Sequence, residues 1–339
     1  MSKRQTLLDI ANRAGVSPRT VSNVVNGYVP VSDKLRKRVE QAVEDLGYRP
    51  NFMARSLRNG RTGLMALVVP EIDVPYFAEL SRTIIEEADA LGYRVMIDQT
   101  AGQMVRERAH IANATQSTLF DGIIFSPLAL SPSDLADIAG STPFVVLGEH
   151  SHGGLFDHVA LDNVQAAADV IAHLHSIGRT RIAAIGQGVG PSDGTKQLRY
   201  DGYVRGLEQV GLPFDPGLVP QSSRRHRELG FDATMQLLDR TDFDALFCFS
   251  DLIAIGAMRA LASRGIRVPE DVAVVGWDDI AEAEFSNPPL TSVAPDKSVL
   301  AKTTLGYLID RMSDPAIAPR DFVVPHTLQI RESSVGVAL

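Results

Sequence analysis

The chain has 339 residues, enough for two or three domains, and its 45% hydrophobic and 22% charged residues are typical of a globular protein. Its sequence contains no apolar run of membrane-spanning length, and its amino terminus lacks the apolar core of an export signal. The single cysteine, Cys248, excludes an internal disulfide and fits a reducing cytoplasm. Together these features predict a cytoplasmic protein that does not associate with membranes.

Formal charge is divided between a basic amino-terminal part and an acidic remainder. Residues 1–61 contain 12 Lys and Arg against 5 Asp and Glu, a net charge of +7. The other 278 residues contain 21 Lys and Arg against 36 Asp and Glu, a net charge of −15. A basic end on an acidic body is typical of a part that binds nucleic-acid phosphates.

Three short helices are predicted in the basic part. Thr6 and Asp9 form a capping box at the start of the first, and Gly15 has the residue type that ends a helix in the left-handed conformation. Ser17 as N-cap and Pro18 at the first helical position predict the second helix. A third is expected over residues 32–46, capped by Ser32-Asp33, with an apolar face of Leu35, Val39, Ala42, Val43 and Leu46.

The second helix is predicted to have two different faces. Val21, Val24 and Val25 can pack on the first helix, whereas the opposite face carries the donor-rich side chains of Arg19, Ser22, Asn23 and Asn26. Two short helices joined by a tight turn, the second with a polar face, are typical of a helix-turn-helix. The alternative is a small bundle with a solvated face, which the local positive charge disfavours.

These residues resemble the head and hinge of LacI/GalR-type transcriptional regulators. The resemblance covers residues 6–26, 31–40, 47–51 and 54–57 of the amino-terminal part and extends over nearly the whole chain. It implies that the second helix lies in the major groove, with Pro18, Arg19 and Asn23 at base-reading positions and Thr6, Ser17, Thr20, Ser22 and Asn26 as further DNA contacts. It also implies a hinge helix that inserts Leu57 into the minor groove, with Asn51, Ala54, Arg55 and Arg58 beside it.

Strands and helices alternate from residue 62 to the carboxyl terminus. The strands are apolar throughout and each precedes an amphipathic helix, which predicts parallel sheets covered on both faces. The series repeats, which indicates two similar α/β lobes. We expect a weak strand at 219–221, and one further helix and one further strand in the tail, at 299–312 and 322–330.

The expected fold is therefore an all-α helix-turn-helix head and hinge helix, followed by a two-lobed α/β body. The resemblance implies that this body is like a periplasmic binding protein, with parallel sheets and three crossovers between lobes. The expected divisions are a head (1–50), a hinge (51–61), a first lobe (62–161 with 296–319) and a second lobe (162–290 with 320–332).

A ligand site is expected between the lobes, because open parallel sheets bind ligands beyond the carboxyl ends of their strands. The side chains that follow the predicted strands are aromatic, acidic or hydroxylated, and a helix contributes Arg199, which suits a polyhydroxylated ligand. The resemblance gives Arg199 and Asp278 as the usual anchors. The candidates are Tyr76, Phe77, Ser126, Asp162, Arg199, Arg225, Ser250, Asp251, Trp277 and Asp278.

Four of these assignments have open alternatives. Asp162, Asp251 and Asp278 each stand where Asp commonly caps a helix or turn. Arg225 occupies a position where many members of the resembled family have an aromatic residue. It belongs either to a solvated charged loop or to the cleft, where it would favour an anionic effector such as a sugar phosphate.

Three other signals are weak. Gly190-Pro191-Ser192-Asp193-Gly194 matches a hydrolase pattern, but Pro191 removes an amide beside the supposed nucleophile. The dinucleotide fingerprint that begins at Gly186 is interrupted by the same proline. His150, His152 and His158 match no strong metal-binding spacing, so neither a metal nor a cofactor is expected.

The sequence thus predicts a homodimeric, ligand-responsive regulator, with a repressor favoured, that binds a pseudo-palindromic DNA operator and is not an enzyme. The expected effector is a sugar or sugar derivative. The alternatives are a solute-binding protein of the same body fold and, with less support, an α/β hydrolase. Residues 1–58 and the absence of an export signal disfavour the solute-binding protein.

Overall fold

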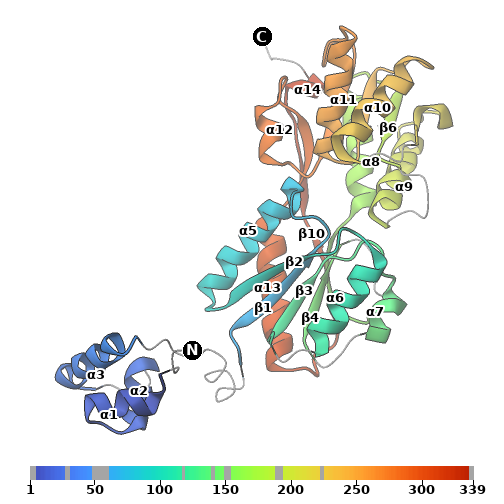
Figure 1. Ribbon diagram of the computed structural model, residues 1–339. Helices are drawn as coiled ribbons and strands as arrows, with labels where there is room; N and C mark the ends of the chain where they lie inside the picture. The colour runs from blue at the N-terminus through green and yellow to red at the C-terminus, as the bar shows by residue number, and fades with distance from the viewer. Residues whose placement is uncertain are drawn as a thin grey trace. The chain divides into compact units, whose positions relative to one another are not determined.

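The chain forms two compact units, Met1–Thr62 and Gly63–Leu339, in a computed structural model (Figure 1). The structure describes residues 5–26, 31–47, 61–116, 119–138, 142–148, 154–187, 194–221 and 225–335. The expected hinge at 51–58 lies outside these residues. Within the described part, no helix is both long and apolar enough to span a membrane.

The first unit contains three helices: α1 (Leu7–Ala14), α2 (Pro18–Asn26) and α3 (Asp33–Asp45). The capping box of α1 is confirmed: the Thr6 hydroxyl accepts from the amide of Asp9, whose carboxylate accepts from the amide of Thr6 at 2.8 Å. Gly15 ends α1 with a φ of 61°. The prediction for α3 was wrong in one detail, because the Ser32 side chain makes no capping hydrogen bond within the described residues.

Apolar side chains from all three helices meet in one small core. The predicted inward face of α2 is confirmed for Val21 and Val24, and Val25 packs against the core. Leu35 does not join it and is half-buried. The buried members are Ile10, Ala11, Ala14, Val21, Val24, Val39 and Ala42.

The first lobe of the second unit is built on a six-stranded sheet in the order β10-β5-β4-β3-β1-β2, with every neighbouring pair parallel. Its strands are β1 (Leu64–Val69), β2 (Arg94–Gln99), β3 (Gly122–Phe125), β4 (Phe144–Leu147), β5 (Asp157–Leu161) and β10 (Asp321–Val324). Its helices are α5 (Pro75–Ala90), α6 (Met104–Gln116), α7 (Pro132–Ile138) and α13 (Lys297–Ser313).

Strand β1 shows why this sheet is covered on both faces. Successive side chains of a strand point to opposite sides, so Met65, Leu67 and Val69 face the core beneath α5 and α13, whereas Ala66 and Val68 join the core beneath α6 and α7. The apolar run that predicts this strand is the consequence of burial on both sides.

The second lobe contains a five-stranded sheet in the order β11-β9-β8-β7-β6, parallel except for the β11–β9 pair. Its strands are β6 (Ile182–Ile185), β7 (Ala245–Cys248), β8 (Ala273–Trp277), β9 (Thr291–Pro295) and β11 (His326–Gln329). Its helices are α8 (Asn163–Ser176), α9 (Gly194–Gln209), η1 (Pro216–Leu218), α10 (His226–Leu238), α11 (Asp251–Ser263), α12 (Ala281–Phe285) and α14 (Glu332–Val335).

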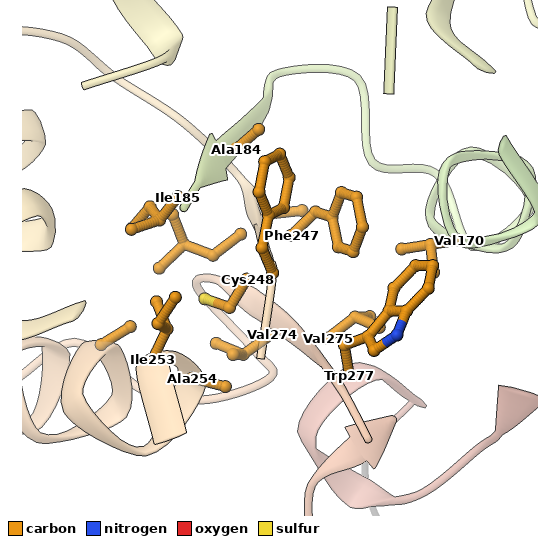
Figure 2. Packing of buried hydrophobic residues seen from close by; sticks show 14 of the residues in the cluster. Val170, Ala184, Ile185, Phe247, Cys248, Ile253, Ala254, Val274, Val275 and Trp277 are labelled. Carbon is orange, nitrogen blue, oxygen red and sulfur yellow. The ribbon is translucent and has the colours of Figure 1, made fainter. Parts of the chain in front are cut away.

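The core of this lobe joins the central strands to the surrounding helices (Figure 2). The ring centroid of Phe247 in β7 lies 5.2 Å from that of Phe249 and 6.0 Å from that of Trp277. Cys248 is fully buried, and burial raises the pKa of its thiol, which fits the predicted packing role and not a reactive one.

The tail corrects two predictions. The single strand expected at 322–330 is two strands, because β10 pairs with β5 of the first sheet and β11 pairs with β9 of the second. Pro325 separates them, since it has no amide to continue a ladder. Assigning all of 320–332 to the second lobe was therefore wrong for β10. The chain crosses between lobes after β5, after β9 and after β10.

Two further elements differ from the prediction. The segment expected as a weak strand at 219–221 follows the 3-10 turn η1, and Asp215 accepts from the amide of Gly217 to start that turn. Strand β9 and helix α12 were not predicted. Both follow the last clearly apolar strand, β8, in a segment interrupted by Pro288 and Pro289.

Candidate functional site

The amino-terminal unit presents the start of α2 at its surface. Ser17, Pro18 and Arg19 are exposed, and Thr20 and Asn23 are half-buried. The Ser17 hydroxyl accepts from the amide of Thr20 at 3.1 Å, so it caps the helix as predicted. The start of α2 therefore presents the guanidinium of Arg19 and the side-chain amide of Asn23, together with the hydroxyls of Ser17 and Thr20, which lie 2.9 Å apart.

Ser22 corrects the prediction for this face. Its exposed fraction is only 6%, because one helical position beyond Val21 it lies beside the apolar side of α2. It also makes a further interaction, so it is not a free donor. Thr6 is exposed, with its hydroxyl and amide both bonded to Asp9. The side chain of Asn26 and all of Asn51, Ala54, Arg55, Leu57 and Arg58 lie outside the described residues.

A cavity of about 200 Å³ lies between the two lobes, where the carboxyl ends of both sheets meet. It is lined by residues that follow β1, β3, β7 and β8 and by the starts of α9 and α10. Eight of the ten predicted ligand residues are in its wall: Tyr76, Phe77, Ser126, Arg199, Arg225, Ser250, Trp277 and Asp278.

Arg199 is held in place from three sides. Its Nε donates to Asn163 Oδ1 at 2.8 Å, its Nη1 donates to the carbonyl of Phe249, and its guanidinium lies 4.2 Å from the centroid of the Trp277 ring. Asn163 is itself buried and donates to the carbonyl of Leu161 at 3.1 Å. The guanidinium is therefore fixed at the cavity wall before any ligand arrives.

The backbone after β8 is unusual. Asp278 and Asp279 have φ values of 108° and 45°. Residues other than glycine seldom adopt this region of backbone conformation. The amide of Asp278 donates to the carbonyl of Val293 at 2.9 Å, which holds the segment on β9. Strain of this kind is often found where a side chain must be aimed at a ligand, and Asp278 is in the cavity wall.

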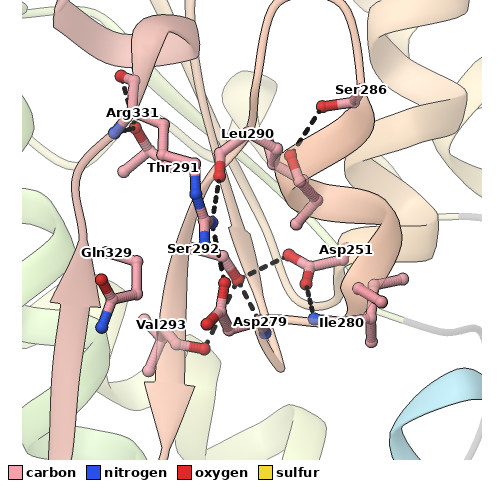
Figure 3. Close-up of polar contacts among 12 residues, drawn as sticks. Asp251, Asp279, Ile280, Ser286, Leu290, Thr291, Ser292, Val293, Gln329 and Arg331 are labelled. Carbon is pink, nitrogen blue, oxygen red and sulfur yellow. Dashed lines mark hydrogen bonds and ion pairs between the residues drawn. The ribbon is translucent and has the colours of Figure 1, made fainter.

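Asp251 and Asp162 lie outside this wall, which corrects two predictions. Asp251 is fully buried and accepts from the amide of Ile280 at 2.9 Å and from the Ser292 hydroxyl at 2.6 Å (Figure 3). Burial, followed by the charge of Asp278, raises its pKa well above the usual range. Asp162 accepts from the amide of Gln165 at 2.9 Å, so it serves as the helix cap that was its alternative role.

Arg225 is exposed but faces the cavity mouth, where it pairs with a residue of the other lobe. Its Nη1 lies 2.6 Å from Glu71 Oε1, and His226 Nε2 lies 2.8 Å from Glu71 Oε2. Glu71 follows β1 of the first lobe, so one carboxylate joins the lobes. Neither Glu71 nor His226 was predicted from the sequence, because no local pattern connects residues 155 positions apart.

A second contact between the lobes is made by residues that do not line the cavity. Glu79 of α5 accepts from the amide of Ala281 at 2.8 Å and lies 2.5 Å from the ammonium of Lys297, which also donates to the carbonyl of Asp279 at 2.9 Å. Glu79, Ala281 and Lys297 were not predicted, since each has the residue type of an ordinary surface helix position.

Comparison with known proteins agrees with this architecture. Residues 6–51 match the family described as bacterial regulatory proteins, lacI family, and residues 171–334 match a periplasmic binding protein-like domain. The chain is 36% identical over 295 residues, 86% of each chain, to the HTH-type transcriptional regulator DegA of Bacillus subtilis (strain 168).

Two solved structures match along most of the chain. A transcriptional regulator CelR–cellobiose complex is similar with a TM-score of 0.72 and 30% identity, covering 97% of this chain and 100% of that one. The lac repressor dimer bound to operator and an anti-inducer has a TM-score of 0.86 and 26% identity, covering 98% and 100%.

Proposed function

Because this chain belongs to the lacI family of bacterial regulatory proteins, we propose that it is a cytoplasmic, dimeric transcriptional repressor whose affinity for an operator is controlled by a small molecule. The observation that carries this proposal is the union of a basic helix-turn-helix with a two-lobed body that contains a cavity at the carboxyl ends of both sheets. The chain is a regulator and not an enzyme.

The start of α2 is the part that reads DNA. Arg19 is exposed and can donate two parallel hydrogen bonds to a guanine edge, and Asn23 can pair with adenine. Pro18 offers apolar contact to a thymine methyl group. Contacts with DNA phosphates position the head on the duplex, and they are made by Thr6, Ser17, Thr20 and Asn26. Ser22 is buried, so its part in DNA binding is to support the helix.

The hinge residues remain part of this proposal. In this proposal Leu57 inserts between base steps of the minor groove, Arg55 and Arg58 add positive charge there, and Asn51 and Ala54 are further DNA contacts. Two heads read the two halves of a pseudo-palindrome, because one head contacts too few base pairs for useful specificity.

The effector binds in the cavity between the lobes. A relative of known structure is named as a complex with cellobiose. The fixed guanidinium of Arg199 and the carboxylate of Asp278 line the same cavity, and both suit a hydroxylated ligand. Arg225 alone gives no reason to expect an anion, since Glu71 compensates its charge at 2.6 Å. Ligand binding changes the angle between lobes, and this change is linked reciprocally to operator affinity.

The test is to select, from random DNA duplexes, those that the full chain binds, and then to titrate the selected operator with the protein. The Arg19→Ala variant should bind about 1–3 kcal/mol more weakly and tolerate any base at one position of each half-site. Arg13→Ala is the matched control, because Arg13 is an exposed arginine of α1 that pairs with Asp45 at 2.9 Å. It removes the same charge and should leave base preference unchanged. Equal base preference in wild type and Arg19→Ala would refute the proposed reading role.

A further inference from the structure

The carboxylate of Glu71 joins the two lobes at the mouth of the cavity. Glu71 follows β1 of the first lobe, and its two oxygens lie 2.6 Å from Arg225 Nη1 and 2.8 Å from His226 Nε2, both of the second lobe. All three side chains line the cavity, and that of Glu71 is only 15% exposed. Because hydrogen bonds of this kind are lost beyond about 3.5 Å, the lobes cannot separate at this edge without breaking both contacts.

His226 has a backbone conformation that needs an explanation. Its φ of 50° lies in the left-handed region, which residues other than glycine seldom adopt. It is the first residue of α10, directly after the N-cap Arg225, so both side chains reach the same carboxylate from the start of one helix. Strained backbone of this kind points to a constraint beyond ordinary packing. Here the contact of the imidazole with the other lobe supplies that constraint.

The charge of the imidazole decides how strongly this contact holds. With a neutral imidazole, the carboxylate of Glu71 and the guanidinium of Arg225 balance, and the bond from His226 is made by an uncharged group. With an imidazolium the same bond joins two opposite charges, which makes it about twice as strong. The other charged side chains of the cavity wall and of the adjoining chain are Asp73, Lys196, Arg199, Arg227, Glu228 and Asp278.

Opening of the lobes changes few of these charges around His226. Arg225 and all of the other charged groups except Asp73 belong to the same lobe as His226, so they stay with it, whereas Glu71 leaves with the first lobe. A nearby opposite charge favours the charged form of a titratable group, and a like charge disfavours it. The closed arrangement therefore binds a proton at His226 more readily than the open one. By reciprocity, binding of that proton favours closure.

We infer that Glu71, Arg225 and His226 form a proton-dependent lock, which holds the two lobes closed over the cavity most firmly when His226 is protonated. Histidine is the side chain whose charge ordinarily changes between about pH 5 and pH 8, so the lobe angle responds to acidity in this range. The lock itself follows from the geometry of the second unit. Its consequence, that operator affinity also changes with pH, rests on the proposed function.

The test is acrylamide quenching of tryptophan fluorescence in the full chain. Trp277 is the only tryptophan, is fully buried and lines the cavity, so its quenching reports how open the cavity is. Between about pH 5.5 and pH 8.5 the quenching constant of wild type should rise at least about twofold as the imidazole loses its proton. In His226→Gln the constant should be independent of pH, because the glutamine amide can still donate to Glu71 but does not titrate.

Two further variants make the result specific to the mouth of the cavity. His326→Gln is the matched control: His326 also pairs with a carboxylate, that of Asp169 at 2.9 Å, but both residues belong to the second lobe. It should keep the wild-type pH profile. Glu71→Gln should raise the quenching constant at every pH and remove most of its pH dependence. A flat wild-type profile, or a pH-dependent profile that persists in His226→Gln, would overturn the inference.

A second measurement separates failure of the lock from failure of the proposed function. The affinity for the selected operator is measured over the same pH range, as the ratio of wild type to His226→Gln. A ratio that changes with pH in parallel with the quenching supports both. A constant ratio beside pH-dependent quenching supports the lock and counts against the proposed link between lobe angle and operator affinity. A constant ratio beside pH-independent quenching overturns the lock alone.

Discussion

Glu79 and Lys297 form an ion pair of 2.5 Å that is sheltered between the lobes, with side-chain exposures of 23% and 17%. The other carboxylate oxygen of Glu79 accepts from the amide of Ala281, and the ammonium donates to the carbonyl of Asp279. The pair therefore joins α5 of the first lobe to the segment that carries Asp278 in the cavity wall. A ligand that moves Asp278 changes a contact made by α5.

We expect Glu79→Ala to lower the free energy of unfolding by about 1–3 kcal/mol, because it leaves a sheltered ammonium and a backbone amide without their acceptor. Glu87→Ala is the matched control: Glu87 lies on the same helix and pairs with Lys302 of α13 at 3.6 Å, with side-chain exposures of 33% for Glu87 and 61% for Lys302. That loss should stay within about 0.5 kcal/mol. Urea unfolding of both variants gives the comparison, and equal losses would show that the sheltered contact contributes nothing special.

Asp157 is a buried carboxylate held by two arginines. It is 1% exposed and accepts from Arg311 Nε at 3.1 Å and from Arg320 Nε at 3.0 Å, and it also accepts from the amide of Arg320. The Arg320 guanidinium lies 3.8 Å from the centroid of the Tyr307 ring. This cluster joins β5 to the end of α13 and to β10, so it holds the returning segment on the first sheet.

Replacing this carboxylate should be strongly destabilising. In Asp157→Asn the partly buried guanidinium of Arg311 loses its counter-charge, and that of Arg320 keeps only the exposed Asp310, which costs about 3–5 kcal/mol. The control is Asp310→Asn, because Asp310 pairs with the same Arg320 at 2.8 Å but is 55% exposed, so its loss should stay below about 1 kcal/mol. Chemical denaturation measures both, and a small loss in Asp157→Asn would mean that water replaces the carboxylate.

The parts of the fold that local sequence pattern determines could be predicted. Apolar strands followed by helices identified both sheets, and positions after strand ends placed Trp277 and Asp278 in the cavity wall, because the carboxyl ends of parallel strands share one edge. Contacts between residues that are far apart in the chain could not be predicted. The contacts of Glu71 with His226 and of Glu79 with Lys297 join residues 155 and 218 positions apart. Asp162 and Asp251 also show that an Asp after a strand serves a cap or a buried network as readily as a ligand.

The buried Asp251 predicts a specific pH dependence. Its pKa is raised by burial and by Asp278, so the folded state keeps the proton that the unfolded state releases near pH 4. Between that pH and the raised pKa the folded state binds more protons, and its stability must fall as the pH rises. Asp251→Asn removes the ionisation and can keep both hydrogen bonds, to Ile280 and Ser292.

The measurement is the difference in unfolding free energy between wild type and Asp251→Asn from pH 4 to pH 8. Wild type should lose stability relative to the variant as the pH rises, with a slope of at most about 1.4 kcal/mol per pH unit. Asp271→Asn is a control, because its partner Arg267 lowers the pKa of Asp271 to about 2. Asp271 is then ionised in both the folded and the unfolded protein over most of this range. The difference in unfolding free energy between wild type and Asp271→Asn should therefore be independent of pH above about pH 5. A flat difference for Asp251 would contradict its raised pKa.

Gly256 lets α11 and α10 pack at very short distance. A Cβ at Gly256 would lie 2.0 Å from the carbonyl oxygen of Arg227, and one at Gly230 would lie 1.9 Å from that of Ile253. Both obstacles are backbone atoms, so no rotamer change can relieve the overlap. Arg227 and Leu229 belong to the start of α10, which also places Arg225 and His226 at the cavity mouth.

Gly256→Ala should therefore force the two helices apart and lower the free energy of unfolding by about 1–3 kcal/mol. Gly306→Ala is the matched control: it lies in the interior of α13, its added Cβ would meet nothing within 4 Å, and the position is exposed. There the lower chain entropy of alanine should raise stability by about 0.5–1 kcal/mol. Thermal and urea unfolding should show that the free energy of unfolding falls in Gly256→Ala and rises in Gly306→Ala. If Gly256→Ala were as stable as wild type, the close approach of α10 and α11 would not be a requirement of this fold.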